Sequence, residues 1–279
     1  MKTFFISIFC SSFLLGMNPQ IEAANLYEIE KKLELDSFSY ATAIKLNEDY
    51  FLTIRHALPH QMNLSSGTYE PGVFDKYDDL SRYEKSCPEY LQRAAMLITN
   101  SEKSNSYIVE KVENGYRAKQ VKNYYNYYSE GDDAVTLVFT QEMPEDFCLA
   151  DMPSISQCNG VNELNNFIFI FIKLVNNGQH FIPYAINLPK IFAFCDYSAH
   201  TWLISKLSVT AGMSGALLCN KNVDMFGVLV GPGKVINLSE ELDKDYLANH
   251  DIDSEGASFS FAYWSKLNSR VNLYWSKAQ

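Results

Sequence analysis

A series of short apolar runs separated by polar turns most constrains how this 279-residue chain can fold. The runs are rich in β-branched and aromatic residues, and Asn, Gly and Asp lie between them, which is typical of short strands joined by turns. No helical periodicity intervenes, so we predict an all-β protein of closed or sandwiched antiparallel sheets. The predicted strands are 40–46, 50–54, 107–112, 134–139, 167–175, 181–186, 191–194, 202–207, 216–219 and 225–230.

Two segments depart from this pattern. Residues 61–93 are polar, acidic and rich in tyrosine, and we interpret them as a long surface insertion with a short helix near 87–96. Near the end of the chain, apolar residues recur at three- and four-residue steps, which predicts a C-terminal helix over 261–277. Its apolar stripe consists of Phe261, Trp264, Leu267, Val271 and Trp275.

The first residues have the features of a secretory signal. Lys2 precedes an apolar stretch, 4–17, that is too short to span a membrane, and small residues follow it at Ala23 and Ala24. We expect 1–23 to be a cleaved signal peptide, and the product to be secreted or periplasmic, without a membrane anchor.

Charge and cysteine content exclude several kinds of partner. The formal charge of −10 argues against nucleic acid, which requires a basic face. Five cysteines remain after the signal, an odd number, and they lack the CxxC or Cys/His spacing of a zinc site. We therefore expect no metal and no cofactor.

Ser214 lies between two glycines, Gly212 and Gly215, directly before an apolar run. A serine hydroxyl becomes a nucleophile only when a base removes its proton and donors stabilise the resulting oxyanion. Glycine before the serine lets the backbone turn so that two N–H groups point at one spot. This turn is therefore a candidate nucleophile site.

His56 is the candidate base, because it lies at the exit of the predicted strand 50–54, where a side chain is held rigidly with its tip exposed. The orienting carboxylate should lie beside a strand, and Asp132 and Asp133 directly precede the strand 134–139. The other histidines, in polar or loop-like contexts, are read as surface residues: His60, His180, His200 and His250.

Together these segments resemble the chymotrypsin/trypsin-like serine endopeptidases, in a divergent and secreted bacterial form. The segment 52–57 (Leu-Thr-Ile-Arg-His-Ala) resembles the family's Leu-Thr-Ala-Ala-His-Cys, 132–135 (Asp-Asp-Ala-Val) its Asp-Ile-Ala-Leu, and 212–217 (Gly-Met-Ser-Gly-Ala-Leu) its Gly-Asp-Ser-Gly-Gly-Pro. The order His, Asp, Ser is also that of the family.

The resemblance implies two six-stranded antiparallel β-barrels, over about 24–145 and 146–260, followed by the C-terminal helix. It implies that Ser214 attacks a peptide carbonyl, that His56 is general base and then acid, and that Asp132 orients His56. The N–H groups of Gly212 and Ser214 would form the oxyanion hole. Asp133 is the alternative acid, and the implied partner is a peptide or protein cleaved by a monomer.

Departures from the family pattern are informative. Met213 replaces an aspartate that pairs with a newly cut N-terminus in relatives, so the oxyanion hole must be set by packing. Ala57 replaces a cysteine, which removes one disulfide. Cys219 matches a family cysteine, and the resemblance implies Cys158 as its partner, with Cys148 as competitor.

The resemblance also places a substrate pocket at Ser208, Val230 and Pro232. Serine at the pocket position, instead of an aspartate, implies an uncharged side chain before the cleaved bond. Pro232 lies where relatives offer a backbone N–H to the substrate, and proline has none.

Two other classes remain. A catalytically silent homologue that binds a partner would explain Met213, Ala216, Arg55 and the insertion 61–93. An α/β-hydrolase esterase would need Gly-x-Ser-x-Gly at a strand-to-helix turn, whereas Ala216 occupies the last position and β-type sequence follows.

Overall fold

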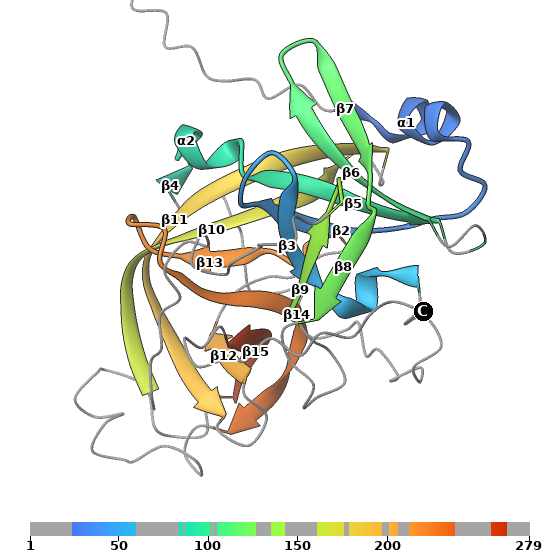
Figure 1. Cartoon of the computed structure of the whole chain (residues 1–279). Coiled ribbons are helices and arrows are strands. Elements are labelled where there is room, and N and C mark those ends of the chain that lie inside the picture. Colours follow the sequence, from blue (N-terminus) through green and yellow to red (C-terminus); the bar gives the residue numbers. More distant parts are fainter. Residues whose placement is uncertain are drawn as a thin grey trace, which may run out of the picture.

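The structure, a computed structural model, describes residues 24–59, 84–85, 87–100, 102, 105–126, 135–142, 161–175, 179–196, 201–205, 212–237 and 258–266. These residues form two antiparallel sheets with little helix, which confirms the all-β prediction (Figure 1). The helical elements are α1 (Leu26–Leu33), the 3₁₀ turn η1 (Arg55–Ala57) and α2 (Pro88–Leu91).

The first sheet has seven strands in the order β7-β6-β5-β2-β3-β9-β8, and each neighbouring pair is antiparallel. Its centre is apolar and buried, because β2, β3, β5 and β9 have almost no exposed side chains. The strands are β2 (Ser39–Lys45), β3 (Tyr50–Ile54), β5 (Ala94–Asn100), β6 (Asn105–Val112), β7 (Gly115–Gln120), β8 (Asn123–Asn126) and β9 (Val135–Phe139).

The second sheet has eight strands, six of which close into a ring. The pairing runs β11-β10-β13-β14-β15-β12, and β12 pairs again with β11. β1 and β4 add to β11 outside the ring. This closure matches the six-stranded barrel predicted for this half, whereas the first sheet has one strand more. The strands are β1 (Ala24–Asn25), β4 (Glu84–Lys85), β10 (Val161–Val175), β11 (His180–Asp196), β12 (Thr201–Ser205), β13 (Leu217–Cys219), β14 (Met225–Asn237) and β15 (Ser258–Lys266).

Residues 167–172 of β10 are buried on both faces, as the length of the apolar run 167–175 suggests. Isoleucine and phenylalanine alternate along 167–172, and alternate residues of a strand point to opposite faces. The isoleucines join one core with residues of the first sheet. The phenylalanines stack on the other face, with ring centroids of Phe169 and Phe171 4.5 Å apart. The two sheets therefore share this strand as a common wall.

The N-terminal helix α1, which the sequence pattern did not indicate, connects the two sheets. Asn25 caps it by accepting a hydrogen bond from the Tyr27 N–H, and β1 pairs with β11 just before it. Ile29 of α1 is buried in the core, and the Tyr116 hydroxyl of β7 donates to the Glu28 carbonyl.

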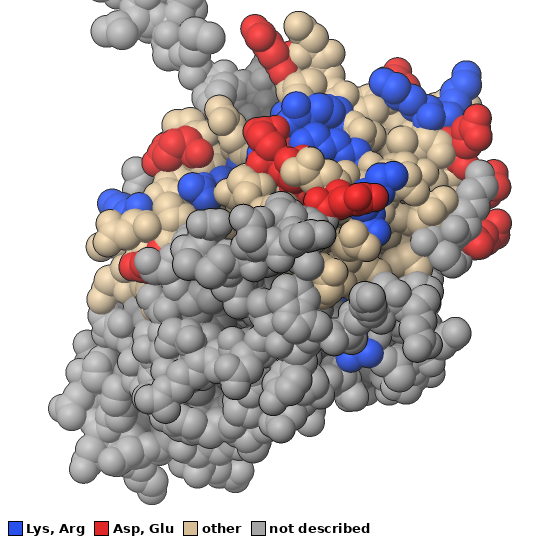
Figure 2. Space-filling view, viewed as in Figure 1, with Lys and Arg blue, Asp and Glu red and all other residues tan. Residues whose placement is uncertain are grey.

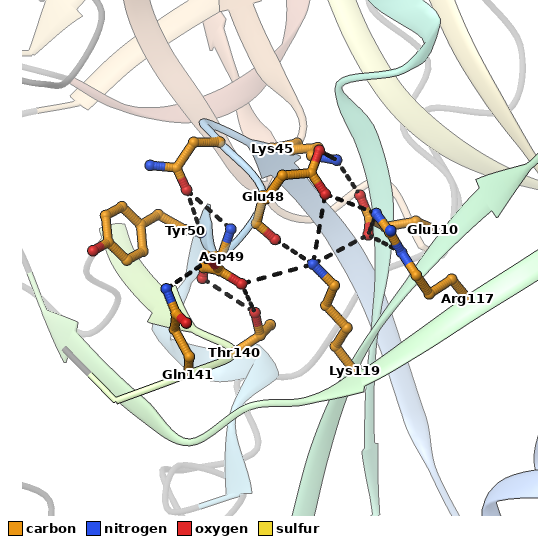
Figure 3. Close-up of polar contacts among 10 residues, drawn as sticks. Lys45, Glu48, Asp49, Tyr50, Glu110, Arg117, Lys119, Thr140 and Gln141 are labelled. Atoms are coloured by element: carbon orange, nitrogen blue, oxygen red, sulfur yellow. Dashed lines mark hydrogen bonds and ion pairs between the residues drawn. The ribbon is translucent and has the colours of Figure 1, made fainter.

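Ion pairs stabilise the turn of the β2–β3 hairpin, which lies at the opposite end of β3 from η1. The buried Glu110 carboxylate lies 2.8 Å from the Lys45 Nζ and 2.8 Å from an Arg117 nitrogen (Figure 3). Burial works to lower the pKa of Lys45, but hydrogen bonds to Glu110 and Glu48 raise it on balance. Acidic and basic side chains adjoin on this described face, so no large patch of one sign forms there (Figure 2).

Two sequence predictions about helices need correction. Phe261 to Lys266 belong to β15, not to a helix, and the remainder of 261–277 lies outside the described residues. The helical spacing from Phe261 onward overlaps a second pattern, the alternation of aromatic and small residues from Phe259 to Tyr263, which favours a strand. Near 87–96 the helix is short, Pro88–Leu91, and Ala94 already begins the fully buried β5. The Ala-Ala-Met-Leu start of β5 has high helix propensity, which burial between β2 and β6 overrides.

Candidate active site

The Ser214 turn is shaped by two glycines in the left-handed region. Gly212 has φ +89° and Gly215 has φ +88°. A Cβ on Gly215 would lie 2.0 Å from the Thr42 carbonyl oxygen and 2.9 Å from the Thr53 Oγ1, so the turn packs directly on the main chain of β2. No residue other than glycine fits there, because both the backbone conformation and the space exclude a side chain.

Hydrogen bonds fix the peptide planes around Ser214. The Ser214 carbonyl accepts from the Thr42 N–H at 2.7 Å, and the Met213 carbonyl accepts from the Ala216 N–H at 2.8 Å. In a planar trans peptide the N–H points opposite to the carbonyl, so the Ser214 N–H points away from Ala216. The Gly215 N–H donates to Leu229 in β14 at 2.7 Å, which ties the turn to the second sheet as well.

Met213 is completely buried, so an apolar side chain fills the position that holds an aspartate in the resembled family. Ser214 beside it is half-buried. The described bonds that shape the turn come from main-chain groups of the turn and β14 and from Thr42.

His56 lies in a short turn, and the residues that follow it, Ala57 and Leu58, are buried. His56 itself is exposed, and the turn, η1, comes directly after β3. The buried Thr99 hydroxyl donates to the Ala57 carbonyl at 2.6 Å, and the Leu58 N–H donates to the Arg55 carbonyl at 3.0 Å. Buried groups therefore hold the turn in place while the His56 side chain is exposed.

The serine and histidine turns are attached to adjoining strands. Thr42 of β2 holds the Ser214 turn, and its carbonyl accepts from the Thr53 Oγ1 of β3 at 2.8 Å. His56 follows Thr53 by three residues. The fold thus places the Ser214 turn against Thr53 of β3, a segment about 160 residues away in the chain.

The other site predictions fall partly outside the described residues. Asp132, Asp133 and Ser208 all lie there. Val230 is half-buried in β14, at a register irregularity between Leu229 and Gly231, and Pro232 pairs with Ala262 of β15. A second irregularity follows Pro232, as expected for proline within a sheet.

Cys219 does not form the disulfide that the family resemblance implied. Cys219 carries a free thiol and is fully buried in the core cluster on β13. Burial raises the pKa of its thiol to about 12. The charges that act on it come from Arg93, Cys87 and Asp224, so its neighbours lie around α2 and the β13–β14 turn. Cys158 and Cys148 lie outside the described residues.

Within the part of the chain that the structure describes, no cluster of His, Cys, Asp and Glu could hold a metal ion. In the same residues, no helix has the length and apolarity needed to cross a membrane.

Comparison with known proteins gives little beyond these observations. No family model matches the chain, and no curated protein matches it. Among solved structures, a mutant of the Tobacco Etch Virus protease is similar, at 7% identity and a TM-score of 0.34, over 80% of this chain and 72% of that chain.

Replacing Gly215 with alanine should abolish the native turn, because the new Cβ would collide with the Thr42 carbonyl. We expect Gly215→Ala to lower the free energy of unfolding by more than about 3 kcal/mol, measured by urea denaturation. Gly115→Ala is the matched control, since Gly115 has φ +135° with no atom within 4 Å of the added Cβ. Equal losses in both variants would show that backbone strain alone, and not the contact with β2, determines the effect.

The Cys219 thiol should resist alkylation in the native state. A buried thiol with a pKa near 12 is almost fully protonated at pH 8, and only the thiolate reacts. Because this pKa is raised above its unfolded value of about 8.5, its contribution to stability is complete below pH 8.5 and is lost as the pH rises toward 12. Iodoacetamide labelling with peptide mass spectrometry checks this. Rapid native labelling at pH 8 would contradict it.

Proposed function

We propose that this protein is a secreted serine endopeptidase in which Ser214 is the nucleophile and His56 the general base. The observation that carries the proposal is the Ser214 turn itself. Two left-handed glycines and the contact with β2 present one serine at the junction of the two sheets, beside the strand that leads to His56.

The proposed reaction proceeds through an acyl-enzyme. His56 accepts the Ser214 Oγ proton as the oxygen attacks the peptide carbonyl, and then gives that proton to the leaving amine. The N–H groups of Ser214 and Gly212 stabilise the negative carbonyl oxygen, a contribution of about 3 kcal/mol for each such donor in comparable sites. Water then repeats the attack and releases the acid product. No cofactor enters any step.

Asp132 is proposed to orient His56. Val135, the first residue of β9, pairs with Ile54, two residues before His56. Asp132 precedes Val135 by three residues in the chain, and this closeness in sequence supports the proposal. Asp133 is closer in sequence to Val135 and remains the alternative.

The proposed substrate is a peptide or protein with an uncharged side chain before the cleaved bond, because Ser208 cannot select a cation. Val230 and Pro232 would line the same pocket from β14. The protein is proposed to act as a monomer after removal of residues 1–23.

An esterase of the α/β-hydrolase class does not fit, because that fold requires a mostly parallel sheet. All strand pairs among the described residues are antiparallel. A silent homologue would share this fold, so chemistry must separate it from an active enzyme.

Ser214 should react with a fluorophosphonate probe, because the probe requires an activated serine beside an oxyanion hole. We expect labelling of the mature protein, complete loss in Ser214→Ala, and a decrease of at least about 100-fold in His56→Ala. Ser39→Ala, on β2, is the control and should label normally. A folded protein whose Ser214 does not label would identify it as a silent homologue.

Asp132→Asn should slow labelling by about 10³- to 10⁴-fold, because the amide favours the wrong imidazole tautomer. Asp133→Asn should change the rate by less than about threefold if that side chain is solvated. Second-order labelling rates for the two variants decide between the carboxylates. A larger loss in Asp133→Asn would assign the role to Asp133.

A further inference from the structure

A buried hydroxyl connects the Ser214 turn to both sheets. Thr42 of β2 has no exposed surface, and its Oγ1 donates to the Gly212 carbonyl at 2.7 Å. The same oxygen accepts from the Ile172 N–H of β10 at 2.9 Å. One side chain thus bonds to the turn, to the second sheet and, through its own strand, to the first.

The main-chain groups of Thr42 also form hydrogen bonds at this junction. Its N–H donates to the Ser214 carbonyl at 2.7 Å, and its carbonyl accepts from the Thr53 Oγ1 at 2.8 Å. Thr42 therefore holds the turn at two carbonyls, those of Gly212 and Ser214, on either side of Met213. A buried threonine with every polar group paired is rigid, because breaking any bond leaves an unsatisfied group.

The bond to the Gly212 carbonyl restrains the peptide that lies between the two proposed oxyanion donors. The Gly212 N–H belongs to the peptide before Gly212, and the Ser214 N–H belongs to the peptide between Met213 and Ser214. The peptide between Gly212 and Met213 lies between them, and its carbonyl is the one that Thr42 Oγ1 binds. Rotation of this middle peptide would swing one donor away from the other, and the hydroxyl opposes that rotation.

We propose that Thr42 is a positioning residue for the oxyanion hole, acting through its hydroxyl and not through its packing volume. The inference rests on the proposed serine peptidase function. Donor groups act only when they are preorganised, and a misplacement of about 1 Å can cost about 100-fold in rate.

Thr42→Val keeps the shape of the side chain and removes the hydroxyl. We expect its maximal rate of fluorophosphonate inactivation to fall about 10- to 100-fold, with the half-saturating probe concentration changed by less than about twofold. Thr42→Ser should restore the rate to within about threefold. Thr140→Val is the matched control, because Thr140 bonds to Asp49 at the opposite end of β3 and should leave the rate unchanged.

A purely structural role predicts different results. Thr42→Val that folds and inactivates at the native rate would overturn the proposal, as would equal losses in Thr42→Val and Thr42→Ser. If Thr42→Val does not fold, Thr42→Cys replaces it, since the thiol is a weaker donor on a side chain similar to serine. The proposal then requires slower inactivation in Thr42→Cys than in Thr42→Ser, and equal rates would overturn it.

Amide hydrogen exchange separates this inference from the proposed function. Thr42→Val, or Thr42→Cys relative to Thr42→Ser, should accelerate exchange in peptides covering Ile172 and 212–215. Unchanged exchange there would overturn the positioning role even if Ser214 never labels. Native protein that does not label would instead reject the peptidase assignment.

Discussion

The close approach of the Gly215 backbone to the main chain of β2 determines where the candidate catalytic groups lie. The contact leaves no room for a Cβ, so it depends on glycine at this position. It allows the Thr42 N–H to reach the Ser214 carbonyl and places the serine where the two sheets meet. β3, which leads to His56, is the neighbour of β2 in the same sheet. The Ser214 turn therefore lies against β2 and β3, the strand that leads to His56, through strand pairing and one backbone contact.

The sequence predicted the parts of this arrangement that leave local signals. A serine between two glycines and a histidine at a strand exit are visible in short windows. In the structure Gly212 and Gly215 have positive φ, and His56 lies in η1 directly after β3. The length of the apolar run 167–175 likewise suits a buried strand. Asp132 and Asp133 are sequence predictions whose positions the described residues do not include.

Other features left no local signal. Thr42 lies between alanines in an ordinary strand pattern, and its hydroxyl bonds to a residue 170 positions away, a relation that only the fold creates. β5 was obscured because its first residues favour helix, and its burial on both sides removes the usual alternation. Cys219 matched a family cysteine by position, but its surroundings on β13 are those of a core residue.

β10 is hydrogen-bonded within the second sheet, but its side chains pack against both halves of the molecule. Its isoleucine face completes the core of the first sheet, and its phenylalanine face packs within the second. Neither half can lose this strand without exposing a row of large apolar side chains to water. The two sheets should therefore melt together in a single cooperative transition, and a chain cut between them should yield fragments that associate or aggregate instead of two independently folded domains.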